Sequence, residues 1–191
     1  GALMTGCART PVQAQDPAGS AWQARASLPY KVQEIYPAVF NGRIHVAGGF
    51  IAQFSTIVGA TDRHTAYDPA SDSWAELAAL PEARHHPHLV AHAGQLWALG
   101  GFRVDGPGSV WVMQPQSWVH EPGAEQWRPA ANAPEPHGET VSASIGDRIH
   151  VVGGRRPRGS ANRTWGDHTD SDRHLVYDPV ADSWATAAPA L

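Results

Sequence analysis

The chain has 191 residues, of which 42% are hydrophobic and 17% are charged, and its formal net charge is -4. This composition is typical of globular proteins, and the acidic balance, with Lys31 as the only lysine, argues against nucleic-acid or anionic-membrane partners. No apolar run is long enough for a membrane-spanning segment, and the single cysteine, Cys7, excludes an internal disulfide.

Residues 1–19 are predicted to be a signal-peptide remnant followed by a disordered linker. Gly1 to Cys7 are small and apolar, and Val12-Gln13-Ala14 would suit a small-x-small cleavage site. Leu3 to Cys7 also loosely resembles a lipoprotein cleavage box with Cys7 as the lipid-bearing residue, although Met4 fits that box poorly. We therefore expect an exported protein, periplasmic or extracellular. Lipid anchoring through Cys7 and a disordered tail with an incidental cysteine stay open as alternatives.

From Ser20 onward, one pattern recurs three times at a period near 50 residues. Each copy has a double glycine, a turn with proline and then a tryptophan. The copies are Gly48-Gly49 with Tyr67-Asp68-Pro69 and Trp74, Gly100-Gly101 with His120-Glu121-Pro122 and Trp127, and Gly153-Gly154 with Tyr177-Asp178-Pro179 and Trp184. Self-similarity at this period indicates a repeat architecture.

Each repeat is predicted to contain four short strands. In the second repeat, the expected strands cover residues 87–93, 95–99, 117–121 and 126–129. Turns of the two-residue hairpin type are expected at equivalent places in the three copies, at Asn41-Gly42, Ala93-Gly94 and Gly146-Asp147. Four strands per period, joined by tight hairpins, are typical of a β-propeller blade.

These motifs resemble those of the kelch-repeat β-propeller family, in the form found in exported bacterial proteins. The resemblance rests on the double glycine, the Tyr-Asp-Pro turn, the acidic residue two positions before the tryptophan, and Arg84 at the start of a repeat. Two positions depart from it: His120-Glu121 replaces Tyr-Asp in the second repeat, and Val32 and His137 stand where Arg84 would be. The repeated residues themselves are interpreted as structural and not as an active site.

The predicted fold is all-β, with three four-stranded antiparallel kelch blades over about 33–78, 85–131 and 138–188. Trp22 lies 26 residues before Gly48, as Trp74 lies before Gly100, so residues 20–26 are predicted to be the closing strand of a further blade. Propellers contain about four to eight blades. We therefore expect a partial ring, completed by blades of a longer chain or by a second copy of this one.

By resemblance, kelch proteins bind partners through two sets of loops at one face: the loops that lead into each blade, and the loops after each double glycine. Loops on a rigid scaffold commonly carry function. The candidate ligand-binding residues of both sets are Glu34, His85, His86, His88, His137, Glu139, Arg155, Arg163 and Trp165.

The histidines among these residues do not predict a metal site. His86, His88 and His92 would share one face of an alternating strand, but residues two apart on a strand splay their side chains by about 6–7 Å along the chain. Their spacing also matches no established zinc or copper motif. No metal and no cofactor are predicted.

Three possibilities remain open from the sequence, and one of them is a purely architectural repeat without a ligand. The first is a binding module that holds a protein or glycan on the loop face, without catalysis. The alternative, by resemblance, is a carbohydrate-active enzyme of the sialic-acid mutarotase type, in which Glu34, His137 and Glu139 would act as acid–base groups. Copper-radical sugar oxidases share the fold, but they need a Cys–Tyr cross-link that Cys7, in the tail, does not supply.

Overall fold

The computed structural model describes residues 22–53 and 56–190, so the predicted tail at 1–19 lies outside the described residues. The described chain consists of β-strands and one short 3-10 helix, η1 (Trp165–Asp167). Within these ranges, no helix has the length and the apolar character that crossing a bilayer requires.

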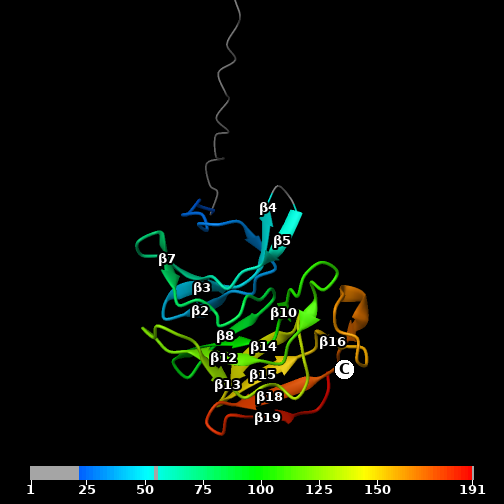
Figure 1. Cartoon of the computed structure of the whole chain (residues 1–191). Helices are drawn as coiled ribbons and strands as arrows, with labels where there is room; N and C mark the ends of the chain where they lie inside the picture. The colour runs from blue at the N-terminus through cyan, green and yellow to red at the C-terminus, as the bar shows by residue number, and fades with distance from the viewer. Residues whose placement is uncertain (1–21, 54–55, 191) are drawn as a thin grey trace, which may run out of the picture.

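Three four-stranded antiparallel sheets form the body of the molecule (Figure 1). We call them the first, second and third blade. The first blade contains β2 (Ala38–Phe40), β3 (Arg43–Ala47), β6 (His64–Asp68) and β7 (Ser73–Leu77). The second contains β8 (His88–His92), β9 (Gln95–Leu99), β12 (Ser117–His120) and β13 (Arg128–Ala130). The third contains β14 (Val141–Ile145), β15 (Arg148–Val152), β18 (His174–Asp178) and β19 (Ser183–Thr186).

The strands follow one another in the order of the chain, as in a meander. In the second blade, β9 pairs with β8 through Val90↔Trp97 and with β12 through Val119↔Trp97. The turn between β8 and β9 has φ of 49° at Ala93 and 76° at Gly94, which is the left-handed backbone of a two-residue hairpin. Asn41 and Gly42 repeat it with φ of 48° and 74°. The predicted strand and turn positions agree with this structure.

The loops after the double glycines contain additional hairpins that the sequence did not predict. They pair β4 (Phe50–Gln53) with β5 (Thr56–Ala60), β10 (Phe102–Arg103) with β11 (Val112–Met113), and β16 (Arg155–Pro157) with β17 (His168–Asp170). A short strand, β1 (Val32–Gln33), adds to β4. In Figure 1, β4, β10 and β16 all lie on the right-hand side of the blades. Each hairpin therefore extends its blade beyond the double glycine, on one side of the molecule.

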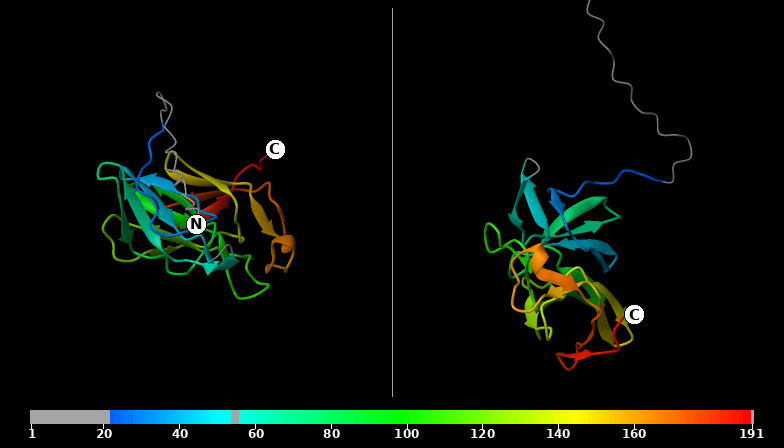
Figure 2. Two further views of the ribbon diagram at one scale, coloured as in Figure 1. Left: turned by 90° about the horizontal axis from the view of Figure 1, so that it is seen from above. Right: turned by 90° about the vertical axis from the view of Figure 1, so that its right-hand side faces the viewer.

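The apolar core lies between the blades. Between the first and second blades, Phe40, Leu89, Leu96 and Trp118 are buried together. Between the second and third blades, a second cluster contains Val90, Trp97, Val119, Ile149, Val151, Leu175 and Tyr177. Burial of apolar area contributes about 25 cal/mol per Å², so blade-on-blade packing is the main stabilising contact. Figure 2 shows the same succession of blades from two further directions.

Residues 22–28 are not part of any described sheet, so the predicted closing strand is not paired here. The segment nevertheless keeps the register of a repeat. The Trp74 indole donates to the carbonyl of Ala26 at 2.9 Å. Trp127 and Trp184 donate in the same way to Ala78 and Ala131, both at 2.9 Å, and each of these alanines follows the last strand of a blade. Ala26 therefore occupies the place that follows a blade's last strand.

Candidate functional site

The three loops that lead into the blades place one residue each at equivalent positions. These residues are Glu34, His86 and Glu139, with φ of 59°, 54° and 53°. A left-handed backbone is uncommon for residues other than glycine and costs of the order of 1 kcal/mol or more. The amide of His86 donates to the carbonyl of Glu34 at 3.0 Å, which joins neighbouring loops. We call Glu34, His86 and Glu139 the rim row.

The double glycines make room for this backbone. A Cβ on Gly101 would lie 2.8 Å from the carbonyl oxygen of His85 and 2.9 Å from that of His86. A Cβ on Gly154 would lie 2.7 Å from the amide of Thr140. All three distances are below any normal contact of a Cβ atom. The repeated glycines are therefore needed, because the leading loop of the same blade passes directly over them.

Polar contacts connect the rim row to the third-blade hairpin. His86 Nε2 lies 2.8 Å from a carboxylate oxygen of Glu34 and 3.9 Å from one of Glu139. The guanidinium of Arg155 lies 3.7 Å from Glu139 and 3.3 Å from Asp170. Arg155 also stacks on the ring of Trp165, at 4.1 Å from the ring centre. Glu34, His86, Glu139, Arg155 and Trp165 therefore form one continuous group.

The hydrogen bonds around His86 require a proton shared with Glu34. His85 donates from Nε2 to the carbonyl of Val110 at 2.7 Å, so the Nδ1 of a neutral His85 is an acceptor. That Nδ1 lies 2.7 Å from Nδ1 of His86, which must donate to it. Nε2 of His86 is then bonded to Glu34 either as an imidazolium to a carboxylate or as a neutral ring to a protonated carboxyl. In both cases, the His86–Glu34 bond carries one transferable proton.

Burial sets the protonation of the groups beside this bond. Burial raises the pKa of Glu139, the Arg155 guanidinium opposes this, and the Glu34 charge adds to it. Burial also lowers the pKa of His86, and Glu34 acts against it. Burial lowers the pKa of His85 to about 3, so His85 is neutral at pH 7. The rim row therefore combines a carboxyl that holds its proton to higher pH with a histidine that is hard to charge.

Tyr36 belongs to this site although the sequence did not single it out. It stacks on His88 with ring centres 5.0 Å apart and lies 5.7 Å from the ring of His86. Burial raises its pKa, and the charges of Glu139 and Glu34 raise it further, so its phenol keeps the proton. Tyr36 occupies the same repeat position as His88, and a comparison of the three leading loops could have found it.

Aromatic rings enclose His85 beneath the rim row. Its ring stacks on Phe50 at 3.7 Å and on Phe102 at 5.0 Å, and it meets Trp111 edge-on at 4.9 Å. His85 is fully buried. It therefore orients His86 and is not itself available to a ligand.

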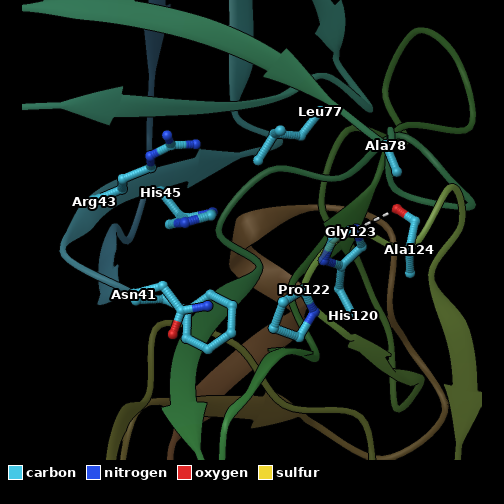
Figure 3. Close-up of a pocket in the computed structure, with 10 residues that line it drawn as sticks. Asn41, Arg43, His45, Leu77, Ala78, His120, Pro122, Gly123 and Ala124 are labelled. Carbon is cyan, nitrogen blue, oxygen red and sulfur yellow. Dashed lines mark hydrogen bonds between the residues drawn. The ribbon is translucent and has the colours of Figure 1, made fainter. Parts of the chain in front are cut away.

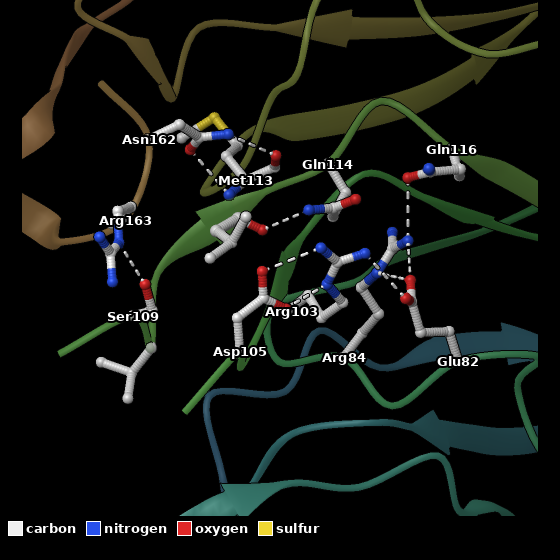
Figure 4. A network of polar contacts seen from close by, with 12 residues as sticks. Glu82, Arg84, Arg103, Asp105, Ser109, Met113, Gln114, Gln116, Asn162 and Arg163 are labelled. Carbon is white, nitrogen blue, oxygen red and sulfur yellow. Dashed lines mark hydrogen bonds and ion pairs between the residues drawn. The ribbon is translucent and has the colours of Figure 1, made fainter. Parts of the chain in front are cut away.

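The other predicted ligand-binding residues, His88, His137 and Arg163, lie apart from the rim row. His88 is partly buried beside Tyr36, and burial lowers its pKa to about 4. His137 is buried against Gly100, and neither of its ring nitrogens has a partner among the described residues. Arg163 donates to Ser109 at 2.6 Å, as Figure 4 shows. The structure therefore does not bring His137 or Arg163 into the rim row, because packing holds the first and a neighbouring loop holds the second. His92, at the far end of β8, bonds Ser144 and lies outside the site too.

Arg84 has a structural role next to this site. Its side chain is fully buried and donates to the carbonyl of Gly100 at 2.8 Å. It also donates to Glu82, at 2.6 Å, and to Gln116, at 3.0 Å, and Figure 4 draws these two partners. It also lies 4.4 Å above the ring of Trp118. A buried charge needs such partners, and this arginine therefore fixes the leading loop of the second blade.

Among residues 22–53 and 56–190, no group of three or more His, Cys, Asp or Glu side chains is arranged to hold a metal ion. The chemistry that the rim row offers is hydrogen bonding and proton transfer.

Comparison with known proteins agrees with this architecture. No protein-family profile matches the chain. It is 29% identical to Kelch-like protein 23 from Homo sapiens over 140 residues, which are 73% of this chain and 24% of that protein. It is 24% identical to Kelch-like protein terF from Aspergillus terreus (strain NIH 2624 / FGSC A1156) over 96% of this chain and 40% of that one. The solved structure described as "Structure of YjhT" superposes with a TM-score of 0.72 at 17% identity, covering 88% of this chain and 55% of that one.

The three stacked four-stranded sheets and this structural likeness define a β-propeller fold. The repeated double glycines and tryptophans, together with the kelch-like relatives, support a kelch-repeat β-propeller family for this chain. The predicted resemblance to kelch-repeat propellers is confirmed, and the exported bacterial form stays a prediction. The chain spans about a quarter to two fifths of the length of these curated relatives.

Proposed function

We propose that the chain is the binding module of a kelch protein and that it holds its ligand on the loop face through the rim row. The observation that carries this proposal is the convergence of Glu34, His86 and Glu139 from three loops, each in a left-handed backbone. Such conformations are kept where the surrounding structure enforces them, and they cluster at functional sites.

The exposed atoms of the site are mainly hydrogen-bond acceptors. The side chain of Glu34 is 45% exposed and that of Glu139 is 26% exposed, whereas His86 beneath them is buried. Trp165, which is 51% exposed, adds a flat apolar surface at the end of the group. A ligand that presents hydroxyl, ammonium or guanidinium donors fits these acceptors. A partner protein and a glycan both offer such groups.

The experiment compares the wild-type chain with Glu34→Gln and Glu139→Gln on a glycan array and on a peptide array. Glu121→Gln is the matched control, because Glu121 lies at the β12–β13 turn and is paired with Arg128. We expect the wild type and the control to bind the same ligand and both rim variants to lose at least tenfold in affinity. Equal binding by all four proteins would remove the rim row from the site. The array that responds distinguishes a glycan from a protein partner.

The second candidate is acid–base catalysis on a sugar, of the sialic-acid mutarotase type. It is favoured by the proton on the His86–Glu34 bond and by the raised pKa of Glu139, since acid–base pairs are formed where environments separate the pKa values of neighbouring groups. NMR of anomer exchange in a free sugar tests it. A rate equal to the buffer control ends this candidate, and a higher rate that Glu139→Gln abolishes supports it.

We also propose, as expected from the sequence, that the protein is exported to the periplasm or the extracellular space. The support is the composition of residues 1–19. Expression of the full-length protein followed by cell fractionation tests it, and a purely cytoplasmic pool would refute it.

Further blades, from a longer chain or a second copy, are proposed to complete the ring. Gly48 and Gly100 each pack against the leading loop of the next blade. The equivalent Gly153 has no such loop beside it among the described residues, and a Cβ added to it would meet only the carbonyl of Ser171, at 3.7 Å. Light scattering of purified protein tests the second copy: a well-behaved dimer supports it, and a stable monomer argues against it.

A further inference from the structure

A groove between the first and second blades, outside the loop face, is lined by histidines. Its volume is about 390 Å³, and Figure 3 shows Asn41, Arg43 and His45 on one side and His120 with Pro122 and Gly123 on the other. Asn41 and Arg43 lie at the start of β3, whereas Gly48-Gly49 and the rim row lie beyond its other end. The groove is therefore a site of its own.

The same groove recurs between the second and third blades but is largely filled. There it has a volume of about 170 Å³ and is lined by Trp97, Tyr177 and Pro179 among others. In the repeat register, Trp97 corresponds to His45, and Tyr177 corresponds to His120. The rings of Trp97 and Tyr177 pack edge-to-face at 5.1 Å. The larger groove therefore results from replacing a tryptophan and a tyrosine by two smaller histidines.

His120 leaves an unused acceptor in this groove. Its Nε2 donates to the carbonyl of Ala124 at 3.0 Å, so the Nδ1 of the neutral ring carries a lone pair. His120 is only 5% exposed, and this Nδ1 is buried without a partner among the described residues. Burying an unpaired acceptor costs about 1–3 kcal/mol. In the first and third blades, the equivalent Tyr67 and Tyr177 instead donate to Asp72 and Asp182.

His45 in the lining and His64, to which it is bonded, are neutral, and Arg43, the charged residue of the lining, is paired. His64 donates from Nδ1 to the carbonyl of Ala78 at 3.1 Å and accepts from Nδ1 of His45 at 2.9 Å. Burial lowers the pKa of His64 to about 3 and that of His45 to about 4, so both are neutral at pH 7. Arg43 is paired with Asp68 at 3.1 Å. The lining includes no carboxylate for a cation, and the charge of Arg43 is already paired, so burying an ion here would be costly.

We infer that this groove binds an uncharged aromatic molecule of about the size of indole, which donates an N–H or O–H to Nδ1 of His120. The aromatic ring would lie between Phe40, Leu77 and Pro122, in the space that the Trp97 indole fills in the neighbouring groove. A volume of about 390 Å³ falls within the range of small-molecule sites, about 300–1,000 Å³.

The experiment titrates the whole chain with indole and with benzofuran, which has the same shape but no N–H donor. Binding is followed by calorimetry and by ¹⁵N shifts of the histidine rings. We expect saturable indole binding that shifts Nδ1 of His120, and benzofuran binding about threefold to tenfold weaker, the worth of one hydrogen bond. Absence of saturable indole binding, or equal affinity for the two probes, would overturn the inference.

The variant His45→Trp/His120→Tyr copies the filled groove and should abolish indole binding. His150→Trp is the matched control, because His150 occupies the position of His45 in the third blade, outside the groove. We expect this control to bind indole as the wild type does. Retained binding by a folded double variant would overturn the inference. If the double variant does not fold, the comparison of the two probes in the wild type still decides the question.

Discussion

The two interfaces between blades share one backbone plan but have different chemistry. Between the second and third blades, Trp97, Tyr177 and Leu175 belong to one buried hydrophobic cluster. Between the first and second blades, the equivalent groove is lined by His45 and His120; His64 is bonded to His45, and Trp127 packs against His64 and His120. The repeated glycines and tryptophans are thus the same at both interfaces, whereas the residues that line the two grooves differ. One interface serves stability, and the other combines stability with a pH-sensitive, ligand-sized space.

The largest expected effect concerns the buried charge beside the first interface. Arg84→Met removes the bonds to Gly100, Glu82 and Gln116 and leaves Glu82 without its closest partner. Breaking such an arrangement costs about 3–5 kcal/mol. Urea unfolding should show this loss. Arg128→Met, at an exposed pair with Glu121, is the control and should change stability by less than about 1 kcal/mol.

The second prediction concerns the filled groove between the second and third blades, which the substitution Trp97→His should make similar to the larger groove between the first and second blades. Trp97→His should destabilise the protein by about 2–4 kcal/mol, since a large buried side chain is lost and a cavity is left between the second and third blades. Thermal unfolding measures the cost. Indole should recover part of the stability at millimolar concentration, because a ligand that binds only the folded state stabilises it. A variant as stable as the wild type would show that the two interfaces are not equivalent.

The third prediction concerns pH. The folded pKa values of His45 and His64, about 4 and about 3, lie below the ordinary value of about 6.5, so between these limits the unfolded chain binds more protons. Stability should therefore fall as the pH is lowered through this window. Hydrogen exchange at pH 7 and pH 5, corrected for intrinsic rates, should show earlier opening of β3 and β6 than of β15.

The variant His45→Trp/His120→Tyr tests the cause of this pH dependence. It should flatten the slope of stability against pH by at most about 1.4 kcal/mol per pH unit for each histidine replaced, and by less for a ring that water still reaches. An unchanged slope would assign the acid sensitivity to His64, which this variant keeps, and to His85, His88 and His137, whose pKa values burial also lowers.

The smallest effect is expected at the second interface. His137 is buried, and its ring nitrogens have no partner among the described residues, whereas the first blade has Val32 at this position. His137→Val removes an unsatisfied polar group and should change stability by about 1 kcal/mol or less, in the stabilising direction. Urea unfolding at pH 7 checks this. A loss above 2 kcal/mol would mean that the imidazole has a partner in solution.

The blades could be predicted from the sequence because their determinants are local. Gly42 and Gly94 need positive φ in a hairpin, and Trp74, Trp127 and Trp184 each bond a carbonyl near 50 residues earlier in the chain. The hairpins after the double glycines were missed because β10 and β16 are only two and three residues long and lack a clear alternation.

The site was predicted in part. Glu34, His86, Glu139, Arg155 and Trp165 come together as one group, and this depended on placing loops rather than strands. The shared proton could not be foreseen, because it follows from the bond between His85 and the carbonyl of Val110, which lies 25 residues away in the chain. The groove was also missed, although His120 already departed from the Tyr-Asp pattern.

The left-handed backbone at Glu34, His86 and Glu139 has a consequence for how this surface can change over time. The glycines beneath each loop leave room for the bend, and the side chains of Glu34 and Glu139 lie partly exposed above it, whereas His86 is buried. Substitutions at Glu34 and Glu139 could then exchange acid for base or amide with little change in the scaffold.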